Sequence, residues 1–307
     1  MFALLRPKRS PATAYGLFDI ELKAIERLSP SLCRYVFGGE DVRRMTTLAP
    51  DQRVKLFFPT PAGAPPSLPH GPHWQKARRG LRPEHTPPMR TYTLRALRRE
   101  AAEVDVDFVL HGVNGPASAW ATDARLGDRL QMVAPNLDYA EDPGGYEWKL
   151  TETTRRVLLV GDETALPAIA GILEQLADHR PELAVYAYLE VPLADDCLTL
   201  RHGPNAQVHW LPRDRLGQAQ GQGMLQAVRE LASLPATQGS GEAFDDIDLD
   251  QQILWEQGGQ AASDFQAWIA GEAMAVREIR RYLLQERGLA KTCLTLMGYW
   301  RAGQSLE

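Results

Sequence analysis

The sequence predicts two joined folds, a six-stranded antiparallel β-barrel followed by a doubly wound α/β unit built on a parallel sheet. Three observations predict this class. Short segments bounded by Gly, Pro or Asp fill the first half of the chain, strand and helix patterns alternate in the second half, and no apolar run approaches the roughly 18 residues of a membrane span. At roughly 100–200 residues per domain, the 307 residues divide into two units, which we place at 15–148 and 152–307.

Six segments of the first half have the length and the boundaries of strands. The clearest is 103–111, where Val104, Val106, Phe108 and Leu110 alternate with mostly polar residues, as on a half-buried strand. The six predicted strands are 17–27, 31–37, 53–58, 90–97, 103–111 and 128–134. Because almost no long helix lies among them, they predict a small antiparallel barrel.

The second half alternates strands with amphipathic helices. A buried strand begins at Arg156, and the apolar residues Ile169, Ile172, Leu173 and Leu176 then follow the spacing of one helix face. Further strands are predicted at 183–189, 207–211, 265–270 and 292–297, and further helices at 224–231 and 276–283, the last ended by Gly288. This alternation predicts a parallel, doubly wound sheet, joined to the barrel by a linker at about 143–151.

The composition is that of an ordinary globular chain, with 44% hydrophobic residues, 24% charged residues and a formal net charge of −5. The first 150 residues carry a net charge of +4, which is too mild for a nucleic-acid-binding face. The three cysteines are far apart, which argues against a metal site built on cysteines and fits a reducing compartment. The start of the chain lacks the residue order of a secretory signal, so we expect a cytoplasmic protein with no membrane or nucleic-acid partner.

Two segments fit neither pattern. Residues 59–88 are rich in proline and basic side chains and predict a long, mobile loop. Three histidines lie in this segment, His70, His73 and His85, and we expect them to be exposed to solvent with no carboxylate near and no bound metal. Residues 238–250 are acidic and predict a solvated loop without a ligand.

The first candidate binding motif is Arg90-Thr-Tyr-Thr, which opens a predicted strand. Side chains two residues apart share a strand face, so Arg90 and Tyr92 point one way while Thr91 and Thr93 point the other. An Arg fork can grip a phosphate, a Tyr ring can stack on a flat cofactor, and a Thr hydroxyl can donate to a ring nitrogen. The alternative is an edge-strand Arg beside a core Tyr.

The second motif is His111-Gly-Val-Asn-Gly-Pro-Ala-Ser, which follows an alternating strand and opens a short helix. Pro116 suits the first helical position, and Ser118 lies in the first turn. Free backbone N–H groups at such a terminus can bind a pyrophosphate, and Gly112 and Gly115 would let the backbone approach it closely. The alternative is a well-capped helix with no ligand.

Two strand-to-helix turns of the second half, Gly161-Asp-Glu-Thr-Ala and Ala270-Gly-Glu-Ala, lie at the carboxyl ends of parallel strands, where nucleotides bind. Neither contains G-x-G-x-x-G, so motif alone does not predict a standard dinucleotide site. Glu272 in the second turn belongs either to a site or merely to a helix N-terminus. The absence of Walker A, G-x-S-x-G and H-E-x-x-H sequences removes the commoner hydrolase and phosphoryl-transfer classes.

Together these motifs resemble the ferredoxin–NADP reductase superfamily, and within it most of all the siderophore-interacting proteins, which are ferric-siderophore reductases. The resemblance spans about residues 15–303 and is carried also by Val54-Lys-Leu-Phe-Phe-Pro and by the ending Gly298-Tyr-Trp-Arg-Ala-Gly. It implies that the barrel binds FAD and that the α/β unit binds NADPH, with NADH as a possible substitute.

The resemblance also implies roles for individual residues. Arg90 would hold the FAD phosphates, while Tyr92 and Thr93 would act at the flavin ring as the catalytic residues. The ribityl chain and pyrophosphate would be lined by His111, Gly112, Gly115, Ala117 and Ser118. The nicotinamide nucleotide would lie near Thr164, Ala165 and Glu272, with Arg213 as a ligand of the 2′-phosphate.

The implied reaction moves electrons from NADPH through FAD to chelated Fe(III), so that the less tightly held Fe(II) is released in the cytoplasm. The substrate would be a ferric siderophore or another Fe(III) chelate. Because such chelates are often anionic, we expect Lys55 first and Arg129 second to bind them. Two alternatives stay open: a general NAD(P)H–flavin reductase with a protein or free-chelate acceptor, and a siderophore-binding protein without catalysis.

Overall fold

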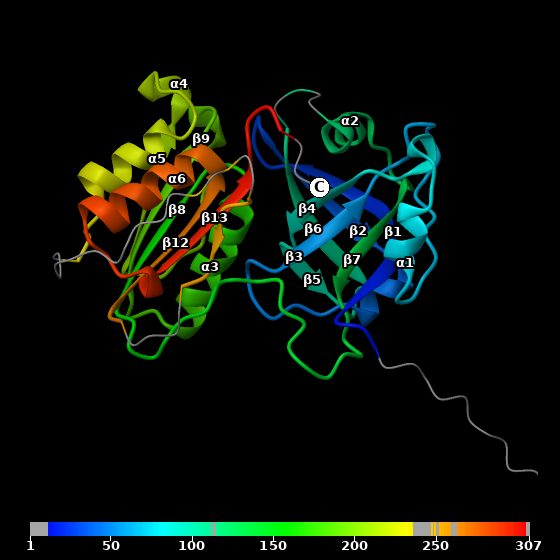
Figure 1. Ribbon diagram of the computed structural model, residues 1–307, viewed down its shortest axis with the longest axis horizontal. Helices are drawn as coiled ribbons and strands as arrows, with labels where there is room; N and C mark the ends of the chain where they lie inside the picture. Colours follow the sequence, from blue (N-terminus) through cyan, green and yellow to red (C-terminus); the bar gives the residue numbers. More distant parts are fainter. Residues whose placement is uncertain are drawn as a thin grey trace, which may run out of the picture.

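The computed structural model describes residues 12–110, 112, 115–235, 247, 249, 252–258 and 263–304. Two β-sheets lie side by side (Figure 1). The curled sheet on the right of the view belongs to the first half of the chain, and the sheet flanked by helices on the left belongs to the second half. Both predicted folds are therefore present in the predicted order.

The first sheet has seven antiparallel strands in the order β4-β3-β7-β1-β2-β6-β5. Their bounds are β1 (Tyr15–Arg27), β2 (Leu32–Gly38), β3 (Arg53–Phe57), β4 (Met89–Thr93), β5 (Ala96–Arg98), β6 (Glu103–Val109) and β7 (Arg129–Pro135). The seventh strand arises because the predicted strand 90–97 is divided. Leu94 N–H donates to the Gln52 carbonyl at 2.8 Å, and Arg95 N–H donates to the Asp105 carbonyl at 2.9 Å. The turn at Leu94 and Arg95 thus joins β4 and β5, which are the two edge strands, and the sheet curls into a half-barrel.

An apolar core fills the inside of this half-barrel, with alternate strand residues such as Val54 and Val106 fully buried. One end is closed by α2 (Pro116–Asp123), which begins at Pro116 as predicted. Trp120 of α2 packs at ring-centroid distances of 5.4–5.9 Å against four aromatic residues, Tyr35, Phe37, Phe58 and Phe108. This contact fixes the helix, and with it the second motif, to the barrel.

The second sheet has six strands in the order β10-β9-β8-β12-β13-β11. Their bounds are β8 (Arg156–Gly161), β9 (Ala184–Val191), β10 (Ala206–Pro212), β11 (Trp255–Glu256), β12 (Phe265–Glu272) and β13 (Leu294–Trp300). Five strands are parallel as predicted, and the two-residue β11 adds an antiparallel edge beside β13. Its brevity explains why no strand pattern is visible in the sequence there.

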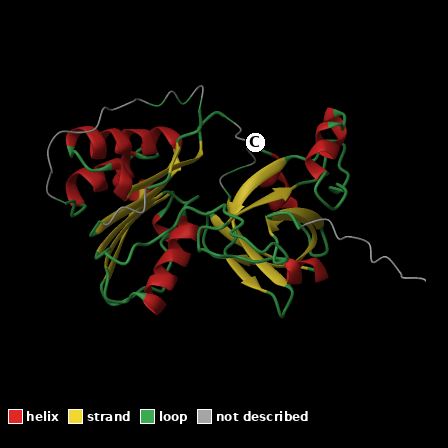
Figure 2. Ribbon diagram, turned by 60° about the horizontal axis from the view of Figure 1, so that its bottom comes forward, coloured by secondary structure: helices red, strands yellow, loops and turns green. Residues whose placement is uncertain are grey.

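Helices cover both faces of this sheet (Figure 2). One face carries α3 (Leu166–His179), whose predicted apolar stripe is buried, and the other carries α5 (Gln222–Gln226) and α6 (Ala273–Arg281). The last two continue as the π-helical turns η4 (Ala227–Leu231) and η5 (Tyr282–Glu286), and Gly288 follows η5 with φ +61°. The short helices are α1 (Trp74–Arg79), α4 (Arg213–Leu216), η1 (Glu40–Arg44), η2 (Pro83–His85), η3 (Ala194–Asp196) and η6 (Lys291–Cys293). No helix in the described part of the chain is long and apolar enough to cross a membrane.

The segment 59–88, predicted as a long mobile loop, is largely exposed but contains two short helices and contacts the outside of the barrel through a few residues. It contains α1 and η2, and Leu68 is buried against Phe57 and Val133 of the outer strand face. The buried Gln131 side chain accepts from Leu68 N–H at 2.7 Å and donates to the Leu68 carbonyl at 3.1 Å. This contact was not predicted, because the segment is rich in proline and because a single buried leucine produces no periodic pattern in the sequence. The predicted acidic loop 238–250 lies outside the described residues except for 247 and 249.

The two halves share a buried junction. Asp51, just before β3, accepts from the N–H groups of Glu147 and Trp148 at 2.8 and 2.9 Å and from Trp268 Nε1 of β12 at 3.3 Å. Burial raises the pKa of this carboxyl. Farther along the junction, Asp196 accepts from the Ser29 hydroxyl and from Ser31 N–H, both at 2.7 Å. These contacts hold the barrel against the parallel sheet.

Gly161 ends β8 where α3 crosses closest to the sheet. A Cβ atom there would lie 2.6 Å from Ala165 Cβ and 2.8 Å from Ile169 Cδ1. We expect Gly161→Ala to lower the free energy of unfolding by about 1–3 kcal/mol through overpacking, as measured by denaturant titration. Gly203→Ala is the matched control, because its Cβ would find only ordinary contacts at 3.6 Å and beyond. Equal stability of the two variants would contradict this account of the crossing.

Candidate functional site

The first motif lies on β4 at the edge of the half-barrel. In the register of β3 and β4, Thr91 faces Lys55, Tyr92 faces Val54 and Thr93 faces Arg53. The Tyr92 ring stacks on Phe108 with centroids 4.3 Å apart and planes 29° apart, at the margin of the barrel core. Thr93 is buried on the opposite strand face. The predicted alternation along this strand is therefore present.

Tyr92 combines the two readings that the sequence left open. Its ring packs on the core, yet the residue is only half-buried and its hydroxyl has no hydrogen-bond partner among the described residues. Burial raises the pKa of Tyr92 well above its ordinary value, so the hydroxyl stays protonated. Arg90, on the same strand face, donates from Nη1 to its neighbour's carbonyl at Met89. A flat ligand placed here would find an aromatic ring and a guanidinium together.

The second motif leads into the N-terminus of α2. Ser118 Oγ accepts from Gly115 N–H and donates to the Gly115 carbonyl, each at 3.0 Å, which caps the first turn. Gly112 has φ +84°, a conformation that favours glycine, and a Cβ at Gly115 would meet open space. Ala117 is buried, and His111 lies outside the described residues.

This donor set fits FAD. Arg90 supplies a cation, the α2 terminus supplies backbone N–H groups for a pyrophosphate, and Tyr92 supplies a ring for a flat heterocycle. The open space beside Gly115 leaves the helix terminus accessible to such a ligand.

Lys55 lies on the outer face of β3, beside this strand edge. Its ammonium is half-buried and has no hydrogen-bond or ion-pair partner among the residues that the structure describes. Burial lowers the pKa of Lys55, and the nearby cations Arg53 and Arg78 lower it further. A positive site without a facing carboxylate is suited to an anionic ligand.

Arg129, the second predicted substrate residue, occupies a different setting. It begins β7, four residues before Val133, which faces Lys55. Its side chain is 80% exposed and lies 3.7 Å from Glu21 of β1. The structure therefore separates the two basic residues along the barrel and leaves Arg129 in an ordinary surface pairing.

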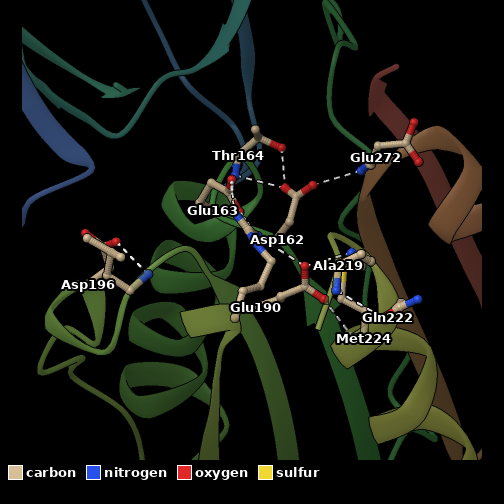
Figure 3. A network of polar contacts seen from close by, with 12 residues as sticks. Asp162, Glu163, Thr164, Glu190, Asp196, Ala219, Gln222, Met224 and Glu272 are labelled. Carbon is tan, nitrogen blue, oxygen red and sulfur yellow. Dashed lines mark hydrogen bonds and ion pairs between the residues drawn. The ribbon is translucent and has the colours of Figure 1, made fainter. Parts of the chain in front are cut away.

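The turn between β8 and α3 is organised by a single buried carboxylate (Figure 3). Asp162 Oδ1 accepts from Thr164 N–H at 2.9 Å and from the Thr164 hydroxyl at 2.5 Å. Its Oδ2 accepts from Glu272 N–H at 2.8 Å and from Trp300 Nε1 at 2.9 Å. Asp162 thus ties together the carboxyl ends of β8, β12 and β13, where a nucleotide is expected. Ala165, predicted beside Thr164, is fully buried, and its N–H donates to the Asp162 carbonyl at 3.0 Å.

Arg213 does not stand free for a 2′-phosphate. Its guanidinium forms a bidentate pair with Glu163, 2.9 Å to each oxygen, and a third contact of 3.1 Å with Glu190. Glu163 and Glu190 are 1% and 0% exposed, so the cation compensates two buried carboxylates. The role of Arg213 at the 2′-phosphate stays a prediction, and its pairing with Glu163 after β8 and with Glu190 of β9 could not be foreseen from the local motif.

Glu272 has the second of its two predicted settings. Its Oε2 accepts from Met274 N–H at 2.7 Å and from Ala275 N–H at 3.1 Å, and so caps α6. Its Oε1 accepts from Ala302 N–H at 3.2 Å. The side chain is buried, and its role in the structure is to hold the helix and the chain end beside the turn.

An aromatic cluster that was not predicted from the sequence lies at the junction. Trp255 stacks on Tyr299 at 5.9 Å, and the Arg53 guanidinium lies 4.3 Å from the centre of the Trp255 ring. Glu147 pairs with Arg53 at 3.0 Å and accepts from Trp255 Nε1 at 2.9 Å. The aromatic residues of the segment Gly298-Tyr-Trp were the sequence feature that could have indicated this cluster. Its partners come from three distant segments, which no spacing rule connects.

The expectation that His70 has no carboxylate near it is wrong. His70 Nε2 lies 3.0 Å from Asp19 Oδ2, and Nδ1 donates to the Leu17 carbonyl at 3.0 Å. Asp41 completes a surface group of three possible metal ligands. An exposed ion pair accounts for the His70 contact, and the hydrogen bond to Asp19 raises its pKa against the opposing effect of burial.

Two family models together match most of the chain. Residues 21–139 match the siderophore-interacting FAD-binding domain, and residues 154–303 match the siderophore-interacting protein model. The chain is 31% identical over 270 residues to the NADPH-dependent ferric-chelate reductase of Escherichia coli, covering 86% of this chain and 85% of that protein. It is 29% identical over 280 residues to the ferric vibriobactin reductase ViuB of Vibrio cholerae, covering 91% and 88%.

The fold is likewise similar to that of solved structures. The siderophore-interacting protein SipS from Aeromonas hydrophila superposes with a TM-score of 0.68 at 25% identity, covering 95% of this chain and 94% of that one. The match extends over both sheets and therefore includes the junction between them.

Proposed function

This chain belongs to the family of siderophore-interacting proteins, and on that premise we propose that it is an FAD-dependent ferric-siderophore reductase that takes its electrons from NADPH. The barrel unit, 15–148, would hold FAD, and the α/β unit, 152–307, would hold the nicotinamide nucleotide. When bound, FAD would supply the chemistry that takes two electrons from one donor and passes them singly to Fe(III). We place the reaction in the cytoplasm, where the released Fe(II) would become available.

The protein's own part in this reaction is placement and charge. Arg90 and the α2 terminus with Gly112, Gly115 and Ser118 would hold the FAD phosphates, while Tyr92 would orient the flavin ring. Thr93, on the other face of β4, would offer its hydroxyl as a donor at the ring edge. Thr164 would face the nicotinamide nucleotide from the second sheet.

The observation that carries the substrate class is the setting of Lys55. A half-buried ammonium without a partner among the described residues, next to two further cations, has a desolvation cost that an anionic ligand would offset. It lies on the neighbouring strand opposite Thr91, on the strand face opposite to that of Arg90 and Tyr92, so the chelate would approach the flavin from the outer face of β4. This favours an anionic Fe(III) chelate over a neutral acceptor and supports a siderophore reductase over a general flavin reductase.

The decisive experiment mixes anaerobic yellow protein with NADPH and then adds an anionic ferric siderophore together with a ferrous trap. We expect two Fe(II) trapped per NADPH oxidised, because the donor gives two electrons and each iron accepts one. A colourless protein that refuses added FAD would instead identify a non-catalytic siderophore binder. Oxidation of NADPH with a dye, but with no Fe(II) from the siderophore, would identify a general flavin reductase.

A further inference from the structure

Asp162 is surrounded almost entirely by groups that can only donate. The N–H groups of Thr164 and Glu272 and the indole Nε1 of Trp300 have no lone pair to offer. Among the residues that the structure describes, the one partner of Asp162 that can also accept is the Thr164 hydroxyl, at 2.5 Å. A protonated Asp162 must therefore donate its proton to Thr164 Oγ, and this reverses the hydrogen bond between the two side chains.

Reversal of this hydrogen bond decides whether the Thr164 hydroxyl can donate to a group outside the turn. When Asp162 is ionised, the Thr164 hydroxyl proton points inward to the carboxylate. When Asp162 is protonated, the same hydroxyl is free to donate outward. Thr164 is the only residue of the turn 161–166 that is not buried, so an outward donor there reaches the proposed nucleotide site.

Few other donors exist at this terminus of α3. Thr164 N–H and Ala165 N–H both bond to Asp162, the first to its carboxylate and the second to its carbonyl at 3.0 Å. Pro167, in the first turn, has no N–H group. An anionic nucleotide would gain from the hydroxyl donor and from the loss of a negative charge directly behind it.

The charges around Asp162 favour proton uptake. Burial and, to a smaller extent, the neighbouring carboxylate of Glu163 together raise the pKa of Asp162 to about 7, against the opposing effect of the hydrogen bonds from Thr164 and Trp300. From the other elements, Glu190 faces the turn across Arg213, Glu272 approaches from β12, and the protonated Tyr299 lies on β13. Arg213 is the single cation of this set, and Glu163 and Glu190 already share it.

We propose that Asp162 is a positioning residue that takes up a proton when the nicotinamide nucleotide binds, and that this proton turns the Thr164 hydroxyl from Asp162 to the ligand. The proposal rests on the proposed function, because it assumes that the nucleotide meets the turn at Thr164. The proton comes from solvent to an Asp162 oxygen, and one hydrogen bond changes its direction without any covalent change in the ligand.

The test on the unaltered protein is calorimetric titration with NADP⁺ at pH 8 in two buffers that differ in ionisation enthalpy. We expect an uptake close to one proton per nucleotide and a dissociation constant that rises about tenfold between pH 8 and pH 9. Phosphate monoesters have a second pKa of about 6, so this window avoids titration of the ligand. Binding without proton uptake overturns the inference alone, whereas no binding of NADP⁺ or NADPH at any pH overturns the proposed function as well.

Two variants locate the proton. Asp162→Asn is neutral at every pH and is expected to bind NADP⁺ with a dissociation constant that does not change between pH 7 and pH 9. Thr164→Val is expected to lose the same pH dependence, because it removes the one acceptor for the Asp162 proton among the described residues. Asp196→Asn, another buried carboxylate with three hydrogen bonds at the junction, is the matched control and should keep the pH dependence. If the dissociation constant of Asp162→Asn for NADP⁺ changed with pH as it does in the unaltered protein, the proton would belong to another group.

Discussion

Replacing Arg213 with methionine is expected to lower the free energy of unfolding by about 3–5 kcal/mol. The substitution keeps most of the side-chain volume but leaves Glu163 and Glu190 buried without their cation. Urea denaturation of the variant and the unaltered protein at the same pH measures this difference.

Two further variants isolate the cause. Arg215→Met removes a neighbouring arginine that is 72% exposed, and should change stability by less than about 0.5 kcal/mol. Arg213→Met combined with Glu163→Gln should recover part of the loss, because one stranded charge is removed. The Arg213→Met variant also tests the predicted role of Arg213 as a ligand of the 2′-phosphate. If it were a ligand of the 2′-phosphate, its loss would raise the KM for NADPH and leave that for NADH unchanged.

The fold was largely predictable because its signals are periodic. Alternation on β6 and the helical spacing along α3 each extend over several residues, and burial of one face follows directly from them. The barrel contacts of segment 59–88 and the two-residue β11 were missed for the opposite reason. Each is held by a few long-range contacts, such as Leu68 with Gln131, that leave no repeating pattern in the sequence.

The candidate site was predictable only where one short segment contains all the chemistry. Arg90, Tyr92 and Thr93 share one strand, so their relative placement follows from the pleat alone. Arg213 lies on α4, while its partners lie in the turn after β8 and near the end of β9, and the sequence offers no sign of that contact. The candidate residues of the second sheet lie at the carboxyl ends of its parallel strands. The strand order of the sheet brings these ends together, although they are far apart in the chain.

Reversing the charge of Lys55 is expected to reduce kcat/KM for an anionic ferric siderophore by about 10- to 100-fold. Lys55→Glu replaces an ammonium by a carboxylate beside Arg53 and Arg78, so the chelate would lose much of the positive charge that attracts it to this face of β3. Oxidation of NADPH with a small neutral acceptor should stay unchanged, because that reaction does not use the ammonium. Steady-state rates with the two acceptors measure the split.

The pH dependence of the unaltered protein gives an independent check on Lys55. Because burial and the neighbouring cations lower the pKa of this lysine, its charge is lost at a lower pH than that of an exposed lysine. Siderophore reduction should therefore decline on the alkaline side before dye reduction does, and the gap should close in Lys55→Gln. Lys23→Glu, a charge reversal beside Glu21 on β1, is the matched control and should leave both rates alone. An equal loss in Lys23→Glu and Lys55→Glu would mean that only the net charge of the barrel matters.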